Sequence, residues 1–252
     1  MGQSFHVRTA VGLDEAMTAD ELEILCEDGP VIAVNKPAGL ISQGAPKGVP
    51  GVVDLVKQYL KQKYNKPGRV YLGIPHRLDR PVSGVMVFSR NSKCAPRLAE
   101  QFANRGVRKI YWACLERPPE RETGTLTDRI YRIPDEPRVK VVPAGTPDAK
   151  EATLDYRVLD RSKGRTLVEV ELKTGRMHQI RIQFASRGCP IVGDLQYGAT
   201  SPFAGATSLD QEHGAIALHA RSLTLQHPIR YDELTITAPL PAMWSELGFH
   251  ST

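Results

Sequence analysis

No run of apolar residues in the 252-residue sequence is long enough to span a membrane, and residues 1–9 are polar where an export signal would be apolar. We therefore expect a soluble, cytoplasmic protein with no membrane partner. Only four residues are cysteine, and they lie too far apart to form a zinc or redox motif. Three of them have apolar neighbours, which predicts reduced thiols in the core.

Signatures of bound cofactors are also missing. No glycine-rich loop is arranged to cradle a phosphate, and the seven histidines form no zinc-binding pattern with cysteines or carboxylates. The composition is otherwise ordinary for a globular protein, with 24% charged and 41% hydrophobic residues. A chain of this length and composition can bury a proper core.

Acidic residues are scarce in one long part of the chain. Residues 57–109 hold thirteen Lys or Arg but only two acids, Asp79 and Glu100, whereas residues 1–35 hold one basic residue and seven acids. Such an excess of positive charge favours a polyanionic partner, because Lys and Arg neutralise phosphates and release their counterions. The alternative is a solvated basic surface that binds nothing.

The hydrophobic pattern predicts strands in hairpins rather than strands alternating with helices. We expect strands within residues 22–42 and at residues 85–88, 109–116, 151–159, 166–172, 222–226 and 234–237. We expect helices over residues 51–64, 91–104 and 178–186 and a short one around Trp244. The third helix is ambiguous, since its apolar residues also alternate as in a strand, but Arg187 and Gly188 form a helix stop signal.

Two segments are expected to be irregular. Residues 117–150 are rich in proline and glycine, which predicts loops with short extended pieces, and residues 197–214 are small and polar, which predicts a mobile loop. Together these patterns predict an α+β fold, a mixed and largely antiparallel sheet with flanking helices. We expect one domain over residues 1–252, with residues 1–20 as an N-terminal extension.

The stretch of residues 74–84 places one acid, Asp79, among three basic side chains, His76, Arg77 and Arg80, with a proline on either side. A carboxylate held in a stiff loop between two expected strands is presented rather than buried, and such loops commonly carry function. The alternative is an ordinary surface loop in which the aspartate pairs with a neighbouring arginine.

Two further stretches have unusual content: KIYWA at residues 109–113 and KTGRMHQIR at residues 173–181. Together with HRLD at residues 76–79, they resemble the RluA family of pseudouridine synthases. Weaker similarity extends over most of the chain, at residues 34–39, 188–194 and 218–220. The resemblance implies that the chain isomerises uridine to pseudouridine in ribosomal or transfer RNA, with no metal or other cofactor.

Three residues match that family's reacting groups. Asp79 corresponds to the nucleophile, Arg181 to the basic partner that keeps it ionised, and Tyr111 to a tyrosine that stacks on uracil and relays a proton. A carboxylate is a useful nucleophile where the electrophile is an activated sugar carbon. Whether Asp79 attacks the sugar, attacks the base or first assists proton loss stays open.

A stacked uridine must leave the RNA helix before an enzyme can act on it. Arg77 is the expected residue to fill the vacated space or to bind the flanking phosphate. Other residues are expected to contact RNA or, for the two histidines, to hold the motif loops together: His76, Arg80, Lys109, Arg176 and His178. The sequence departs from the family pattern at Val82, often Thr, and at Gln183, often His.

Many relatives carry a basic RNA-binding domain ahead of the catalytic one, and residues 1–35 are acidic instead. We therefore expect a stand-alone catalytic domain, a monomer that binds a compact RNA stem-loop through its own basic face. A non-catalytic RNA-binding paralogue would be expected to lack Asp79, Tyr111 or Arg181, and all three are present. A nucleoside hydrolase would need a second carboxylate beside Asp79, and none flanks it.

Overall fold

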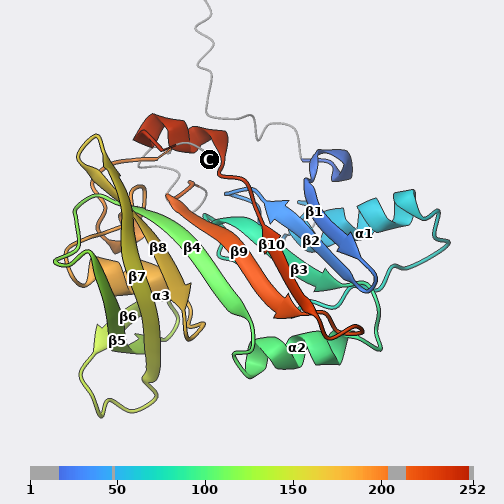
Figure 1. The fold of residues 1–252 in the computed structure, drawn as a ribbon, viewed down its shortest axis with the longest axis horizontal. Helices are drawn as coiled ribbons and strands as arrows, with labels where there is room; N and C mark the ends of the chain where they lie inside the picture. The colour runs from blue at the N-terminus through green and yellow to red at the C-terminus, as the bar shows by residue number, and fades with distance from the viewer. Residues whose placement is uncertain (1–16, 47–48, 204–213, 250–252) are drawn as a thin grey trace, which may run out of the picture.

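The computed structural model describes residues 17–46, 49–203 and 214–249. The expectations for residues 1–16 and 204–213 lie outside that part. Within it, one ten-stranded sheet crosses the molecule (Figure 1), in the order β1-β2-β3-β9-β4-β8-β7-β5-β6, with β10 also pairing to β9. Among these strand pairs only β3 and β9 run parallel. The structure therefore confirms the predicted α+β class with a mixed, largely antiparallel sheet.

The elements have the following bounds. The strands are β1 (Ile24–Asp28), β2 (Val31–Lys36), β3 (Ser83–Ser89), β4 (Arg108–Leu115), β5 (Thr123–Arg132), β6 (Val139–Val142), β7 (Lys150–Ser162), β8 (Arg165–Leu172), β9 (Leu218–Gln226) and β10 (Glu233–Thr237). The α-helices are α1 (Val52–Lys63), α2 (Ala95–Ala103) and α3 (Gln179–Ala185), and the 3-10 helices are η1 (Ala19–Glu21), η2 (Leu195–Tyr197) and η3 (Ala242–Leu247). No helix in these described ranges is long and apolar enough to cross a membrane.

Helices cover both faces of the β2–β3 region. Alternate residues of a strand point to opposite faces, so Ile32 joins the large core cluster that contains the apolar side of α1, while Val31 joins a second cluster. That second cluster contains Leu98 of α2. Both strands are therefore almost wholly buried, which fixes the position of the loop that leads into β3.

The parallel contact between β3 and β9 is short and depends on a glycine. It consists of two residue pairs, Ser83 with His219 and Gly84 with Ala220. Gly84 has φ +114°, and a Cβ there would lie 2.3 Å from the Ala220 carbonyl oxygen. Only glycine permits this backbone approach, so Gly84 joins the β1–β2–β3 part of the sheet to the remainder.

Two sequence predictions about local structure were wrong. Helix α2 begins at Ala95 rather than near Asn91, because Asn91 opens a turn in which its side chain accepts the Lys93 N–H at 2.8 Å, and the turn leads into the helix. Residues 117–150 contain the ten-residue strand β5 as well as β6. The prolines of that segment lie outside both strands, and pairing of β5 with β7 holds it extended.

Candidate active site

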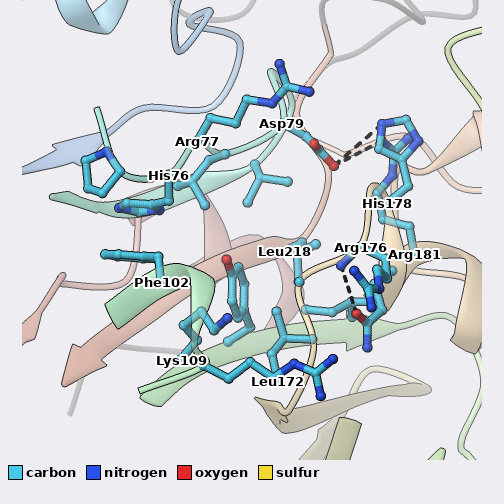
Figure 2. Close-up of a pocket in the computed structure, with 18 of the residues that line it drawn as sticks. His76, Arg77, Asp79, Phe102, Lys109, Leu172, Arg176, His178, Arg181 and Leu218 are labelled. Atoms are coloured by element: carbon cyan, nitrogen blue, oxygen red, sulfur yellow. Dashed lines mark hydrogen bonds and ion pairs between the residues drawn. The ribbon is translucent and has the colours of Figure 1, made fainter. Parts of the chain in front are cut away.

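A cavity of about 440 Å³ lies where the loop before β3, strand β4, the end of α2 and the start of α3 meet (Figure 2). Asp79, Tyr111 and Arg181 all line it, although about a hundred residues separate the first from the last. The cavity also brings together five of the six predicted RNA-contacting positions: His76, Arg77, Lys109, Arg176 and His178.

The loop that carries Asp79 is held on both sides by the segment after β2. The Ser42 hydroxyl donates to the Leu78 carbonyl at 2.6 Å, and the Leu78 N–H lies 3.2 Å from the Ser42 hydroxyl oxygen. The Arg80 carbonyl accepts from the Gly39 N–H at 2.8 Å and from the Lys36 ammonium at 3.0 Å. Because these bonds fix the residues on each side of Asp79, its carboxylate has a defined place.

Lys36 is completely buried and donates to two carbonyls, those of Pro37 and Arg80. Burial lowers the pKa of Lys36 to about 7, because water no longer solvates the ammonium, and the nearby Asp79 charge only partly opposes this. A lysine in this position links the end of β2 to the Asp79 loop.

Arg181 is fixed chiefly by an acid other than Asp79. Its Nε and Nη2 donate to the two carboxylate oxygens of Asp194 at 2.7 and 2.8 Å, and Nη2 also donates to Gln196 at 2.8 Å. The guanidinium lies 4.9 Å from the Tyr197 ring centre. Its third nitrogen, Nη1, lies 3.7 Å from Asp79 Oδ2. Burial opposes the charge, but Asp194 and Asp79 outweigh it and raise the pKa of Arg181, so the cation is permanent.

His178 approaches the same Asp79 oxygen from the residue before α3. Its Nε2 lies 3.6 Å from Oδ2, and its Nδ1 lies 2.8 Å from the Tyr197 hydroxyl. Figure 2 shows the Asp79 carboxylate directed at His178 and Arg181 together. Burial lowers the pKa of His178 despite the nearby Asp79 charge, so the ring is neutral at pH 7.

Tyr111 lies in β4, paired with Val170 on one side and Ala220 on the other. Burial, reinforced by the negative charge of Asp79, raises the pKa of its hydroxyl. The phenol therefore stays protonated and can donate or accept a proton within the cavity. Its position on a central strand gives the ring a rigid support.

The remaining cations of the cavity lack acidic partners among the described residues. Arg77 and Arg105 are exposed and have no ion pair there, and the same holds for half-buried Lys109. Burial, together with the charge of Arg105, lowers the pKa of Lys109. Figure 2 shows Arg77 extending away from Lys109. Arg176 donates from Nε to the Glu151 carbonyl at 2.9 Å.

Two predicted positions have mainly structural contacts. The His76 ring stacks on Phe102 with centroids 4.5 Å apart, and its Nε2 accepts the Val87 N–H at 2.9 Å, so it holds the loop on the sheet. Burial lowers its pKa to about 3. Arg80 does not line the cavity, and its Nε donates to the Gly39 carbonyl at 2.9 Å.

The positions that depart from the family pattern lie in the packed interior. Val82 is 2% exposed. The Gln183 amide nitrogen lies within hydrogen-bonding distance of the Leu126 and Ala152 carbonyls and of Asp128, which ties α3 to β5 and β7. Gln183 thus supports the helix that carries Arg181.

Sequence reasoning did not single out Asp194, Tyr197, Lys36 or Arg105. A signal existed for two of them, since Lys36 lies in the 34–39 similarity and Asp194 in the 188–194 similarity. Their contacts depend on long-range folding that no local pattern shows. In the described part of the chain, no three His, Cys, Asp or Glu side chains are grouped as metal ligands would be.

The model of one protein family, RNA pseudouridylate synthase, matches residues 30–186 of the sequence. The chain belongs to the RNA pseudouridylate synthase family. This family consists of RNA isomerases, so the predicted enzyme class is confirmed. The match includes Asp79, Tyr111 and Arg181 within its range, and the RluA-type resemblance is confirmed as well.

Curated members of the pseudouridylate synthase family align over most of the chain. An uncharacterized RNA pseudouridine synthase of Synechocystis sp. is 33% identical over 94% of this chain and 71% of its own length. The ribosomal large subunit pseudouridine synthase D of Xylella fastidiosa is 37% identical over 87% of this chain and 66% of its own length. The solved structure of human RNA pseudouridylate synthase domain containing 4 is 27% identical, with a TM-score of 0.74 over 91% of this chain and 95% of that one.

Proposed function

We propose that this chain isomerises particular uridines in structured RNA to pseudouridine, with Asp79 as the nucleophile. The observation that carries the proposal is the meeting of Asp79, Tyr111 and Arg181 in one cavity of the family's fold. In the proposed reaction the bond from the ribose C1′ to uracil N1 breaks, the uracil turns, and C1′ bonds to C5. The proton on C5 then passes to solvent and N1 takes up a proton from solvent, so the product has the mass of the reactant.

The geometry suits Asp79 to act as a nucleophile, because the two basic side chains beside it both approach the same carboxylate oxygen. His178 and Arg181 approach Oδ2, whereas Oδ1 has no hydrogen-bond or ion-pair partner among the described residues. The side chain of Asp79 retains 32% of its exposure, so a substrate can reach it. A carboxylate fixed through one oxygen keeps the other available for attack.

Tyr111 and Arg77 complete the proposed site. The protonated phenol of Tyr111 can stack on an extruded uracil and transfer a proton late in the reaction. Arg77, exposed and without an acidic partner among the described residues, fills the space that the uracil leaves in the RNA. Arg105, Lys109 and Arg176 bind backbone phosphates along the cavity.

Large-subunit ribosomal RNA is the first substrate to test, because several aligned relatives are named ribosomal large subunit pseudouridine synthase D. Transfer RNA is the second, since its stem-loops also present a uridine in a compact fold. We propose that the protein works on either RNA as a cytoplasmic monomer. Pseudouridine mapping in total RNA from cells with and without the gene identifies the modified position.

Tritium release from RNA labelled at uracil C5 tests the reaction. We expect release with the wild-type protein and none above background with Asp79→Asn, which keeps the shape of the side chain but removes the nucleophile. Asp20→Asn is the matched control, because Asp20 is exposed and does not line the cavity. Full activity of Asp79→Asn would refute the assignment of the nucleophile. Salt-sensitive RNA binding without tritium release from any RNA would instead favour a non-catalytic paralogue.

A further inference from the structure

The Tyr197 hydroxyl lies between the backbone of β6 and the ring of His178. The Val139 N–H donates to this oxygen at 3.0 Å, and His178 Nδ1 lies 2.8 Å from it. On the other side of the ring, His178 Nε2 faces Asp79 Oδ2 at 3.6 Å. The three side chains of Tyr197, His178 and Asp79 therefore form one continuous line from β6 to the cavity.

Counting protons along this line selects one tautomer of His178. A neutral imidazole has one N–H and one lone pair. If Nδ1 carried the proton, the Tyr197 O–H would have no acceptor among the described residues, and the Nε2 lone pair would face a carboxylate oxygen. If Nε2 carries it, the tyrosine donates to Nδ1, and the Nε2–H points at Asp79.

We propose that Tyr197 fixes His178 as the neutral tautomer with its proton on Nε2, and that His178 is thereby a positioning residue that, together with Arg181, holds Asp79 through Oδ2. This inference rests on the proposed function, because its purpose is to leave Asp79 Oδ1 free for attack. The same tyrosine ring lies against the Arg181 guanidinium, so one side chain of η2 supports both groups that face Asp79.

The surroundings of His178 keep its ring neutral and hold its backbone in an uncommon conformation. Burial lowers its pKa most, the charges of Arg181 and Arg77 lower it further, and those of Asp79 and Asp194 oppose them. The residue also has φ 49°, a left-handed conformation that side chains other than glycine seldom adopt. Such a conformation is kept where the surrounding structure imposes a particular side-chain position.

NMR of the free protein with ¹⁵N-labelled histidine tests the tautomer without any RNA. Long-range ¹H–¹⁵N correlations separate protonated from unprotonated ring nitrogens, and the signals absent from His178→Gln identify His178. We expect the proton on Nε2 in the wild type and a mixture of tautomers in Tyr197→Phe, which keeps the ring beneath Arg181. A proton on Nδ1 in the wild type, or an unchanged His178 pattern in Tyr197→Phe, would overturn the proposal.

Activity tests the positioning role. Gln at residue 178 can offer an amide N–H near the place of Nε2, whereas Leu of similar size cannot, and both have the same backbone constraint. We expect His178→Leu to lower kcat by roughly ten- to a hundredfold, because the 3.6 Å contact of the free protein shortens to a hydrogen bond with the charged carboxylate when RNA binds. His178→Gln should recover most of that loss, and KM should change little in either variant.

Tyr231→Phe is the control for loss of a hydroxyl, since Tyr231 is 57% exposed and does not line the cavity. Equal losses in His178→Gln and His178→Leu would reduce His178 to a packing role and overturn the inference. If NMR shows the expected tautomer but the wild type forms no pseudouridine in any RNA, the proposed function fails while the tautomer assignment stands.

Discussion

The arginines that line the cavity lie in two different environments. Arg181 is 4% exposed, with its guanidinium bound by Asp194 and Gln196 and supported by the Tyr197 ring. Arg77 and Arg105 are exposed, and no acid among the described residues pairs with them. The same type of side chain thus serves as a fixed charge where the reaction is proposed to occur and as an exposed binding group where the RNA is proposed to lie.

Removing the Asp194 carboxylate that binds Arg181 should have the largest effect on stability and activity. Asp194→Asn leaves a buried guanidinium without its bidentate carboxylate, and breaking such a pair costs about 3–5 kcal/mol. We expect urea unfolding to show a loss of that size, together with a severe loss of pseudouridine formation. Glu122→Gln breaks an exposed pair with Arg161 and should cost less than about 1 kcal/mol. Similar losses for the two variants would contradict the distinction.

Acid should lower the free energy of unfolding through His76, which holds the Asp79 loop on the sheet. Its pKa is about 3 when folded against an ordinary 6.5, so below pH 6.5 the unfolded chain binds a proton that the folded chain does not. Stability is therefore full above pH 6.5 and falls as the pH drops toward 3, by up to about 5 kcal/mol. Urea unfolding between pH 7 and pH 4 measures this. His76→Gln should have a shallower pH dependence, and an unchanged slope would refute the role of His76.

Removing the open cations should change binding rather than folding. We expect Arg105→Ala and Lys109→Ala each to raise KM, to leave kcat nearly unchanged, and to reduce the slope of log affinity against log salt by about one. Filter binding of the substrate RNA at several salt concentrations gives the slope. Lys150→Ala, an exposed lysine outside the cavity, is the control. An unaltered salt slope in both cavity variants would place the RNA backbone elsewhere.

The smallest expected effect is an increase in stability, from replacing Arg105 by glycine. Arg105 has φ 60° just after α2, where the Gly106 N–H bonds to the Gln101 carbonyl at 2.8 Å, the position at which helices favour glycine. We expect Arg105→Gly to stabilise the fold by about 0.5–1 kcal/mol while weakening RNA binding. Asn104→Gly should destabilise instead, because Asn104 has φ −87°. A melting curve for each variant tests this, and loss of stability in Arg105→Gly would contradict the strain argument.

The parts of the fold set by local pattern could be predicted from the sequence. The β1–β2 hairpin, α1 and the β7–β8 hairpin across Lys163 and Gly164 were confirmed, since their periodicity and turn residues agree with one another. Strand β5 was missed because its extended state comes from pairing with β7, which no local composition reveals. The order of the strands in the sheet likewise depends on contacts between distant segments.

The candidate site shows the same division. Short sequence motifs were enough to predict Asp79, Tyr111 and Arg181 as site residues, and the structure brings all three to one cavity. The motifs gave no indication that Asp194 holds Arg181 or that Tyr197 contacts His178, because both contacts join segments whose approach is decided by packing. The assignment of Arg80 to RNA came from its neighbours in sequence, while in the structure its Nε bonds to the Gly39 carbonyl.

The contact of Gly84 with Ala220 has a mechanical consequence for the whole molecule. Asp79 belongs to the loop before β3, whereas Tyr111 and Arg181 belong to elements on the far side of that contact. The distance from Asp79 to Tyr111 and Arg181 therefore depends in part on a strand contact only two residue pairs long. A bulkier residue at position 84 would push the two strands apart, and would thereby separate Asp79 from the rest of the candidate site without contacting any of its side chains.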